Sequence, residues 1–363
     1  MVVLPNVKDR PICAPPEDKS RQGKRGFANA TDPPHGADWM HAVDSSLPLI
    51  APPAHPIAQR MTPERYATRV ERQRNRERYQ SQRYDPLYLI SRIIPVNQTI
   101  RWGLKATGLY RHARREFTTP RLVHLEHRCP RWPAAFDGLR ILHLTDLHID
   151  IDPGLIPAIL AGIEGAECDL CVITGDFRNS HDTPRQEVLQ LSQRILEALP
   201  QPVYGTLGNH DEVELAEPLE ATGLIRLLMN EHVVLPFRGG QFTLAGIDDT
   251  FFHEAGDIPA AMAGAPTAQE SPRILLAHGP DIVEEADRHQ VAFTPCGHTH
   301  GGQICLPGGK PLLAIDKLPS HLLAGAWRAG DMIGYTSRGT GGCRVPVRLN
   351  CPAEITLHTL RPA

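Results

Sequence analysis

Short apolar runs that end in polar loops recur from about residue 136 to the carboxyl end of the chain. Two stretches between them, residues 153–165 and 184–199, have the length and composition of helices. Strands that alternate with helices are typical of a layered α/β sheet domain, in which ligands bind beyond the carboxyl ends of the strands. The runs that we expect to be strands are LRILHLTD, LCVITGD, PVYGTLGNHD, FTLAGIDD, RILLAHGPD and AFTPCGHTH.

The amino-terminal part of the chain lacks this alternation. Residues 1–60 are rich in proline without helical or strand periodicity, and residues 62–85 are dense in arginine with almost no apolar stripe. A helix that is polar on all sides is solvated or unstable, and a polar, proline-rich chain is typically disordered. We therefore predict a disordered proline-rich and arginine-rich tail over residues 1–84.

Residues 85–135 mix apolar and basic side chains, which predicts an amphipathic helical connection to a catalytic domain over residues 136–363. Pro95 interrupts the apolar pattern, so two short amphipathic helices fit better than a membrane span. Two interpretations stay open: residues 60–117 contact a membrane surface, where apolar side chains beside Arg and Lys are favoured, or residues 85–117 pack on the catalytic domain. The sequence shows no signal peptide, so the expected location is the cytoplasm, with the inner membrane as a site of peripheral attachment.

Composition narrows the function only a little. Hydrophobic residues make up 41% and charged residues 22% of the 363 residues, as in an ordinary soluble enzyme. The net charge is −3, and residues 136–363 show no basic patch with interleaved aromatic residues, so we expect no nucleic-acid partner. The eight cysteines form no disulfide framework, and Cys168 and Cys171 are interpreted as two half-buried thiols.

Five of the predicted strand exits carry side chains that bind metals. Asp146 and His148 are separated by one residue, and in an extended chain residues i and i+2 point to the same side. If the extended backbone continues to residue 148, both side chains aim at one point. His298 and His300 repeat this spacing, and glycine beside several donors leaves room for a tight turn. The candidate donors are Asp146, His148, Asp176, Asn209, His278, His298 and His300.

The ordered motifs D-x-H, GD, GNHD, a single His and GHxH resemble those of the calcineurin-like metallophosphoesterase superfamily over residues 146–300. The longer GHTHGGQICLPGG resembles a bacterial branch of that superfamily. The resemblance implies a layered sandwich of two mixed β-sheets flanked by helices. It also implies that Asp176 bridges two metal ions, that His210 stands beside the leaving group and that Asp211 orients His210. The other implied ligands are Asp146, His148 and His300 for one ion and Asn209, His278 and His298 for the second.

The residue types agree with this implication. Oxygen donors with imidazole nitrogens, and no thiolate, suit Mn²⁺, Fe or Zn²⁺. Two ions about 3.5–4 Å apart clamp the attacking and leaving oxygens of a phosphoryl displacement and activate a water as hydroxide. Two divalent ions, the carboxylates of Asp146 and Asp176 and one hydroxide leave a net charge of about +1, which attracts an anionic ester.

Several other residues carry weaker signals. Arg178 and Arg338 lie in loops near the motifs, and each is equally compatible with binding a substrate phosphate and with a solvated side chain. For Asp248 and Asp249 we favour a structural role over substrate contact, and His143 alternates with core residues as a packed histidine. The histidines that match no motif are expected at the surface: His181, His253, His289, His321 and His358.

We therefore expect a dinuclear metal-dependent phosphoesterase that hydrolyses a phosphate monoester, diester or pyrophosphate bond by attack of a metal-activated hydroxide. The substrate is a phosphorylated small molecule, or a lipid-linked one if residues 85–117 meet a membrane. A nuclease or cyclic-nucleotide phosphodiesterase on the same fold is the alternative enzyme. A non-catalytic scaffold is the alternative of another class. It is disfavoured because scaffolds usually lose ligands or the GNHD histidine, and both are present here.

Overall fold

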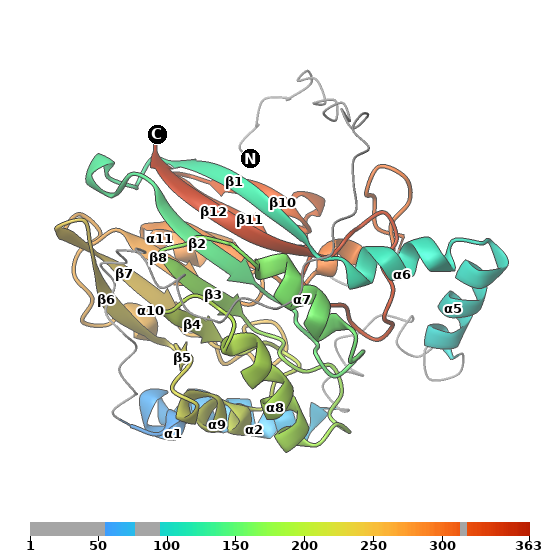
Figure 1. Cartoon of the computed structure of the whole chain (residues 1–363). Helices are drawn as coiled ribbons and strands as arrows, with labels where there is room; N and C mark the ends of the chain where they lie inside the picture. The colour runs from blue at the N-terminus through green and yellow to red at the C-terminus, as the bar shows by residue number, and fades with distance from the viewer. Residues whose placement is uncertain (1–54, 77–94, 313–317) are drawn as a thin grey trace, which may run out of the picture. The chain divides into compact units, whose positions relative to one another are not determined.

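The computed structural model describes residues 55–76, 95–312 and 318–363, which belong to one compact unit spanning residues 43–363. Two mixed six-stranded sheets form its centre, as the sequence predicted (Figure 1). In the first sheet β12 is antiparallel to β2, and all other neighbours are parallel. In sheet order its strands are β1 (Arg121–Cys129), β12 (Glu354–Pro362), β2 (Leu139–Leu144), β3 (Leu170–Thr174), β4 (Val203–Thr206) and β5 (Arg226–Leu227).

The second sheet is parallel in its middle and antiparallel at both edges. The two sheets share a core in which Ile141, Val172, Phe242 and Phe293 are fully buried. Strands that are covered on both faces have near-continuous apolar sequences, which explains the apolar runs. In sheet order its strands are β10 (Gly325–Ala329), β11 (Met332–Thr336), β9 (Val291–Cys296), β8 (Arg273–Leu276), β7 (Gly240–Gly246) and β6 (Glu231–Phe237).

Helices cover the outer faces of both sheets. Ile156, Ile159 and Ile163 recur on one face of α7 and pack into the core on the outer side of the first sheet. In the same core Cys168 and Cys171 are fully buried free thiols with Sγ atoms 3.6 Å apart, rather than half-buried ones. The covering helices are α7 (Leu155–Ile163), α8 (Arg185–Leu196) and α9 (Ala216–Ala221) on the first sheet and α10 (Ile258–Met262) and α11 (Val283–Arg288) on the second.

Two helices change the picture of the amino-terminal segment. α1 (Ile57–Arg60) and α2 (Pro63–Arg74) lie beside α9 (Figure 1). Arg69, in the middle of α2, is fully buried and forms an ion pair with Asp248 at 2.9 Å. The prediction of a solvated helix or disordered arm is wrong for this stretch, because acidic groups from distant parts of the chain match its arginines. The rest of the predicted tail, outside residues 55–76, lies outside the described residues.

Two short helices, α5 (Val96–Ala106) and α6 (Tyr110–Thr118), follow Pro95. The sequence predicted two amphipathic helices with the break at Pro95, but both described helices come after this proline. α6 buries Ala113 and Phe117 against the sheet unit, so this part of the segment packs on the catalytic domain. The first strand then begins well before residue 136, the predicted start of the domain. None of the helices in the described part of the chain has the length and apolar character to cross a bilayer.

The loops that carry the predicted metal ligands meet at one edge of the two sheets. They follow β2, β3 and β4 of the first sheet and β8 and β9 of the second. The backbone N–H of Asp146 donates to the Gly175 carbonyl at 3.0 Å, and that of Gly297 donates to the His278 carbonyl at 2.7 Å. Between the sheets, the backbone N–H of His298 donates to Asp146 Oδ2 at 3.0 Å. The fold therefore places the ligand loops of both sheets in direct contact.

Candidate metal centre

The backbone leaves the strand direction at most of the predicted ligands. β2 ends at Leu144, and Asp146 and His148 have φ angles of 51° and 41°. The predicted extended backbone through residue 148 is therefore wrong, and left-handed turns aim these side chains instead. Such conformations cost about 1–3 kcal/mol each in non-glycine residues and cluster at functional sites. The other predicted ligands with positive φ are Asp176 (56°), His298 (69°) and His300 (53°).

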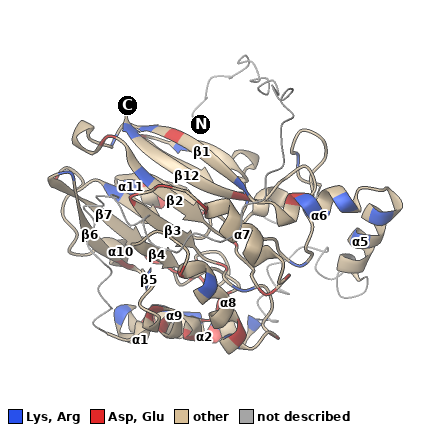
Figure 2. Ribbon diagram, viewed as in Figure 1, with Lys and Arg blue, Asp and Glu red and all other residues tan. Residues whose placement is uncertain are grey.

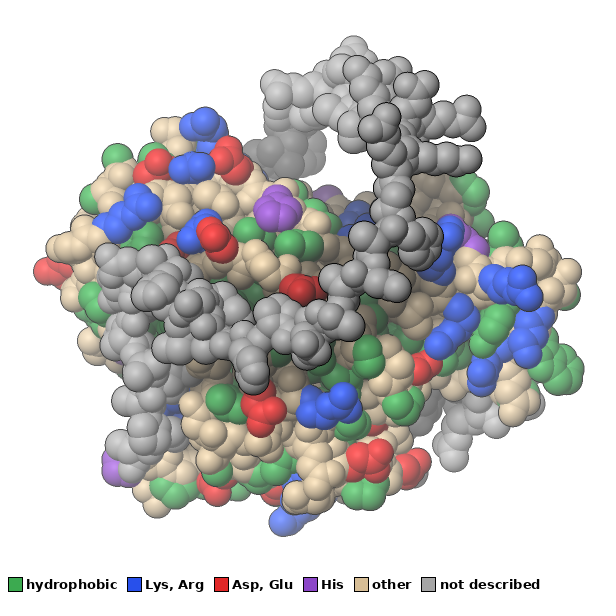
Figure 3. Space-filling view, in the orientation of Figure 1, with side chains coloured by type: hydrophobic (Ala, Val, Ile, Leu, Met, Phe, Trp, Pro, Cys, Tyr) green, Lys and Arg blue, Asp and Glu red, His purple; other side chains and the backbone are tan. Residues whose placement is uncertain are grey.

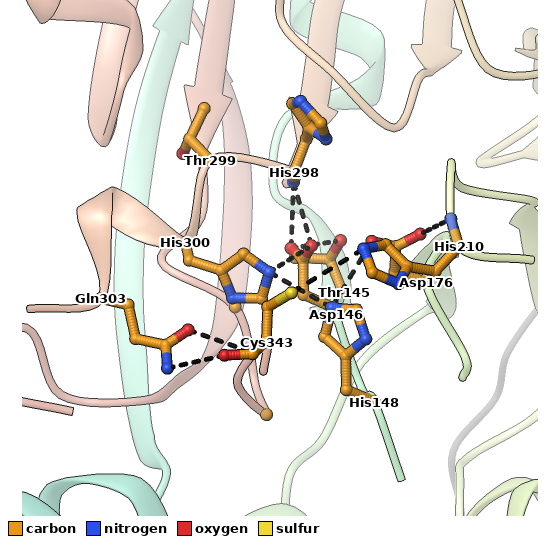
Figure 4. Close-up of polar contacts among 12 residues, drawn as sticks. Thr145, Asp146, His148, Asp176, His210, His298, Thr299, His300, Gln303 and Cys343 are labelled. Carbon is orange, nitrogen blue, oxygen red and sulfur yellow. Dashed lines mark hydrogen bonds and ion pairs between the residues drawn. The ribbon is translucent and has the colours of Figure 1, made fainter. Parts of the chain in front are cut away.

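A first donor set consists of Asp146, His148, Asp176 and His300, whose ligand atoms all lie within 4.8 Å of one another (Figure 4). The Nε2 atoms of His148 and His300 are 3.2 Å apart, and His300 Nε2 is 3.4 Å from Asp146 Oδ1. All four residues are buried. Two imidazole nitrogens and two carboxylates that face one point form a cation site.

A second donor set consists of Asp176, Asn209, His278 and His298. Asn209 Oδ1 lies 3.0 Å from His278 Nε2 and 2.8 Å from His298 Nδ1. Asp176 Oδ2 is 3.3 Å from His278 Nε2 and 3.4 Å from His148 Nε2 of the first donor set. The structure thus brings all seven predicted ligands together, with Asp176 between the two sets.

Backbone carbonyls select the tautomer of two of these histidines. Nδ1 of His148 lies 2.8 Å from the Arg178 carbonyl, and Nδ1 of His278 lies 2.7 Å from the Thr174 carbonyl. A carbonyl oxygen only accepts, so in each ring Nδ1 carries the proton and Nε2 presents its lone pair to the donor set. Metal-binding histidines in proteins are held in this way.

The buried carboxylates need positive charge. Asp146 is 0% and Asp176 1% exposed. Burial raises the pKa of Asp146, although the nearby His278 ring opposes this. Burial also opposes ionisation of Asp176, but the neighbouring His278 and His210 rings hold its pKa well below the usual range. Buried charges are retained when they are paired or bind metals, so this set of oxygen and nitrogen donors fits a divalent metal centre.

Two glycines let the loops approach each other. A Cβ atom added to Gly208 would collide with the carboxylate of Asp176, and one added to Gly297 would collide with that of Asp146. The prediction that glycine leaves room beside the donors is confirmed. Any larger residue would displace a carboxylate of the centre.

His210 lies beside the first donor set, with its ring centroid 4.8 Å from that of His148. Its backbone N–H donates to Asp176 Oδ1 at 2.8 Å, and its Nδ1 lies 3.0 Å from the Asn179 carbonyl. The surrounding protein desolvates the ring and lowers the pKa of His210 well below its ordinary value. The imidazole is therefore neutral, with its proton on Nδ1.

Asp211 has a different task from the predicted one. Its carboxylate accepts hydrogen bonds from the backbone N–H groups of Phe177 and Gly208, both at 2.9 Å. The Asn179 carbonyl, and not Asp211, is the group that contacts the His210 ring. Asp211 thus ties the loop after β3 to the loop after β4.

The two predicted substrate arginines serve internal contacts. Arg178 is 1% exposed, and its guanidinium binds Glu212 at 3.0 Å and the carbonyl of Thr183 at 2.7 Å. This corrects the prediction that Arg178 contacts a substrate phosphate, because its donors lie within the protein. Arg338 is partly exposed and paired with the buried Glu354 at 2.7 Å, so its substrate role stays a prediction.

Several of the histidines and acidic residues outside the motifs lie in the core. His143 is packed as predicted, and it lies 3.3 Å from His358, which in turn lies 2.9 Å from His127. The prediction of surface positions is wrong for His358 and His253, which are fully buried. Asp249 accepts from the backbone N–H groups of residues 251 to 253 and has the structural role that we favoured.

Two residues at the site, Cys343 and Gln303, were not predicted from the sequence. The thiol of Cys343 is half-buried, lies 3.8 Å from His210 Nε2 and groups with His148 and His300 (Figure 4). Gln303 donates to the Cys343 carbonyl at 3.0 Å and accepts from its N–H at 2.9 Å, so it holds this loop in place. The glutamine stands inside the quoted GHTHGGQ motif, whereas nothing in the sequence marks the cysteine.

Two facing mixed sheets that bring these donors together at one edge are the framework of a metal-dependent phosphoester hydrolase. A family model of calcineurin-like phosphoesterases matches residues 139–307. The chain belongs to this family, since relatives with 30% identity or more align over most of their own length.

Three relatives illustrate the range of the family. Phosphodiesterase YaeI of Escherichia coli is 32% identical over 65% of this chain and 87% of its own length. The uncharacterized metallophosphoesterase YkuE of Bacillus subtilis is 30% identical over 71% of this chain and 92% of its own. A transmembrane protein with a metallophosphoesterase domain from Danio rerio is 30% identical over 67% of this chain and 58% of its own.

Proposed function

We propose that the protein hydrolyses a phosphate monoester, phosphate diester or pyrophosphate bond at a centre of two divalent ions, Mn, Fe or Zn. The observation that supports this most is the position of Asp176, within 3.4 Å of His148 on one side and 3.3 Å of His278 on the other. A carboxylate between two donor sets is the ligand that a dinuclear centre shares. When bound, the ions supply an activated water and positive charge for the phosphoryl group.

His210 is the residue that we propose to protonate the leaving group. The Asn179 carbonyl holds Nδ1, so Nε2 is the atom available on the site side, where Cys343 also lies. A bound anionic ester favours the imidazolium form, because a nearby negative charge raises the proton affinity of the ring. Transfer of a proton from Nε2 to the departing oxygen is general acid catalysis.

The relatives and the geometry also rank the alternatives. The printed name of the Escherichia coli relative, a phosphodiesterase, favours a diester among the three bond types. A nuclease or cyclic-nucleotide phosphodiesterase would use the same donors, and assays with nucleic acid and cyclic nucleotides separate these activities from a small-molecule phosphoesterase. A non-catalytic scaffold is disfavoured, because all seven donors and His210 occupy one site.

The test is hydrolysis of bis-p-nitrophenyl phosphate and p-nitrophenyl phosphate by protein loaded with Mn²⁺, Fe²⁺ or Zn²⁺. We expect turnover that a chelator abolishes and added metal restores. Asp176→Asn should lower turnover about 100-fold or more, since loss of a group that only supports a metal ligand already costs about 10–100-fold. A folded, metal-loaded protein that hydrolyses neither these esters nor a pyrophosphate would refute the proposal.

We also propose that α5 contacts an anionic membrane surface and that the substrate is lipid-linked. Trp102 is 72% and Leu109 42% exposed, and Arg101, Lys105 and Arg111 are exposed around them. Figure 2 shows Lys and Arg positions along α5 and α6, and Figure 3 shows basic side chains beside hydrophobic ones in this part of the molecule. Apolar and basic side chains on two short neighbouring helices and the turn between them suit the interface of an anionic membrane. A relative named as a transmembrane protein is consistent with work at a membrane.

A further inference from the structure

A short β-hairpin of residues 304–312 follows the last ligand loop of the metal centre. Cys305 and Pro311 pair across the hairpin in an antiparallel bridge, and Cys305 is buried. Leu306 and Leu312 are the chain neighbours of this pair. Because successive side chains of an extended chain point to opposite faces, both leucines point away from the buried face.

The outward face of the hairpin exposes large apolar side chains. Leu306 is 47% and Leu312 56% exposed. Trp102 in α5 and Leu109 in the turn before α6 are exposed as well. Four of the five large hydrophobic side chains that are exposed in the described part of the chain therefore come from the hairpin and from the α5–α6 segment.

The hairpin and the two helices border one packed cluster. The backbone N–H of Cys305 donates to the Leu349 carbonyl at 2.8 Å, and that of Arg348 donates to the Ala113 carbonyl of α6 at 2.9 Å. Ile304, at the base of the hairpin, packs on an apolar cluster with members from α5 and α6. Exposed apolar side chains that are grouped around one cluster mark a contact site, whereas single ones need no explanation.

Basic side chains accompany the exposed apolar ones. Residues 96–115 and 304–312 contain no acidic residue. An anionic lipid surface attracts basic side chains, and its acyl chains receive apolar ones. Apolar tips together with charge of one sign therefore fit an anionic membrane. The exposed basic residues of the two segments are Arg101, Lys105, Arg111, Arg115 and Lys310.

The backbone of the hairpin tip is suited to leaving water. Pro307 and Pro311 have no N–H group. The backbone N–H groups of Leu306, Gly309 and Leu312 donate to carbonyls within the hairpin at 2.8, 3.0 and 2.9 Å. A buried backbone donor without a partner costs free energy. Donors that are satisfied inside the hairpin therefore add little cost when the tip enters a lipid layer.

We propose that the hairpin of residues 304–312 is a second membrane-contacting element, which inserts Leu306 and Leu312 into an anionic lipid surface. This inference rests on the proposed membrane contact of α5 and extends it to a distant segment of the chain. Gln303, which precedes the hairpin, donates to the Cys343 carbonyl at 3.0 Å beside the metal centre. Contact at the hairpin therefore brings the centre close to the headgroup layer, where the phosphoryl group of a lipid-linked substrate lies.

The test is flotation of the full chain with vesicles of phosphatidylglycerol and phosphatidylethanolamine. Leu306→Asp should lower the partition coefficient about tenfold or more, because one leucine side chain taken out of the lipid is worth at least that factor. Leu306→Met should float as the wild type does, since it keeps the apolar surface. Vesicles of phosphatidylcholine should bind the wild type more weakly, because they lack the negative charge that attracts the basic residues.

Val234→Asp is the matched control for an added negative charge, since Val234 is 37% exposed on β6 and lies outside the apolar cluster. It should float as the wild type does. Equal losses in Leu306→Asp and Val234→Asp would overturn the inference, because the added charge alone would then explain the effect.

The remaining outcomes separate the proposals from one another. Equal flotation of Leu306→Asp and the wild type would overturn the contact through the hairpin and leave the contact through α5 in place. A wild type that does not float would reject both membrane contacts. Flotation does not require turnover, so the proposed hydrolase function is judged separately, by ester hydrolysis.

Discussion

At the scale of single residues, two neighbours hold His210, the proposed acid. The ring is oriented by the Asn179 carbonyl and its backbone by the Asp176 carboxylate. A metal ligand and the proposed acid are therefore coupled through one short hydrogen bond of 2.8 Å. A change in the metal-binding carboxylate also moves the loop that carries the acid.

His210→Ala should slow esters with poor leaving groups far more than esters with good ones. A stable leaving group departs without a proton, whereas an alkoxide needs one, and general acid assistance is worth about 10²–10⁴-fold. Turnover of p-nitrophenyl and alkyl phosphodiesters by metal-loaded protein measures the difference. Equal losses for both classes would show that His210 does not act as the acid. A metal content in the variant equal to that of the wild type shows that the substitution has not removed the metal centre.

The sequence predicted which residues meet at the candidate centre, but not their backbone conformation. The spacing of Asp146 and His148 was attributed to an extended strand, whereas both residues have positive φ. The motif selects the correct residues under either geometry. Left-handed turns at residues with a Cβ are set by the packing of neighbouring loops, as at Gly208 and Gly297. The sequence pattern of one strand contains no information on that packing.

At the scale of elements, α2 shows why a polar helix can be misjudged. Its arginines lack an apolar stripe, which predicts a solvated helix. Their partners Asp248 and Asp257 lie more than 170 residues away in the sequence. Local periodicity cannot reveal such partners, so the burial of Arg69 could not be predicted from the sequence pattern.

Arg69→Ala should destabilise the protein by about 3–5 kcal/mol near neutral pH, because it leaves the buried Asp248 carboxylate unpaired. Burial raises the pKa of Asp248 to about 6 even with Arg69 in place. The folded state therefore binds more protons than the unfolded state from pH about 4 to 6, and the free energy of unfolding falls as the pH rises through this range. Without Arg69 this pH range extends to higher pH.

Urea unfolding of Arg69→Ala at pH 5 and pH 8 measures this effect. The loss in the free energy of unfolding relative to the wild type should be smaller at pH 5, where the Asp248 carboxyl group is protonated. In the double variant Arg69→Ala/Asp248→Asn the extra pH dependence should vanish. A loss that is the same at both pH values would mean that Asp248 stays ionised without its partner.

α5 is the element for which we propose contact with a membrane. Trp102→Asp should reduce flotation with vesicles of phosphatidylglycerol and phosphatidylethanolamine, because it removes a large apolar side chain that is 72% exposed and adds negative charge. Val234→Asp is the control, since Val234 is 37% exposed on β6. Flotation of the wild type that equals that of Trp102→Asp would reject membrane contact through α5.

At the scale of the whole molecule, two sheets from different parts of the chain each contribute part of the centre. The rule that ligands gather at the carboxyl ends of strands predicted this common edge correctly. It could not predict that the amino-terminal helix would join the same edge, because α2 is not part of the alternation of strands and helices. The sheet framework was therefore predictable, and the additional contacts to it were not.

Metal loading should stabilise the whole protein. The carboxylates of Asp146 and Asp176 are buried, so a bound cation stabilises them. A ligand at 100 times its Kd adds about 2.7 kcal/mol to the free energy of unfolding. Calorimetry should show a higher Tm with Mn²⁺ or Zn²⁺ than with a chelator. Asp176→Asn should show a much smaller difference. An unchanged Tm in the wild type, with metal bound by elemental analysis, would contradict this prediction.

The position of β12 has a consequence for how the protein is made. This strand lies between β1 and β2 in the first sheet, so residues 121–129 and 139–144 have no common neighbour until residues 354–362 exist. During translation both early strands have an unpaired edge until more than two hundred further residues are synthesised. Open edges recruit other chains and invite aggregation. Productive expression will therefore depend on protection of the nascent chain, and slow or cold translation is expected to help the yield less than co-produced chaperones.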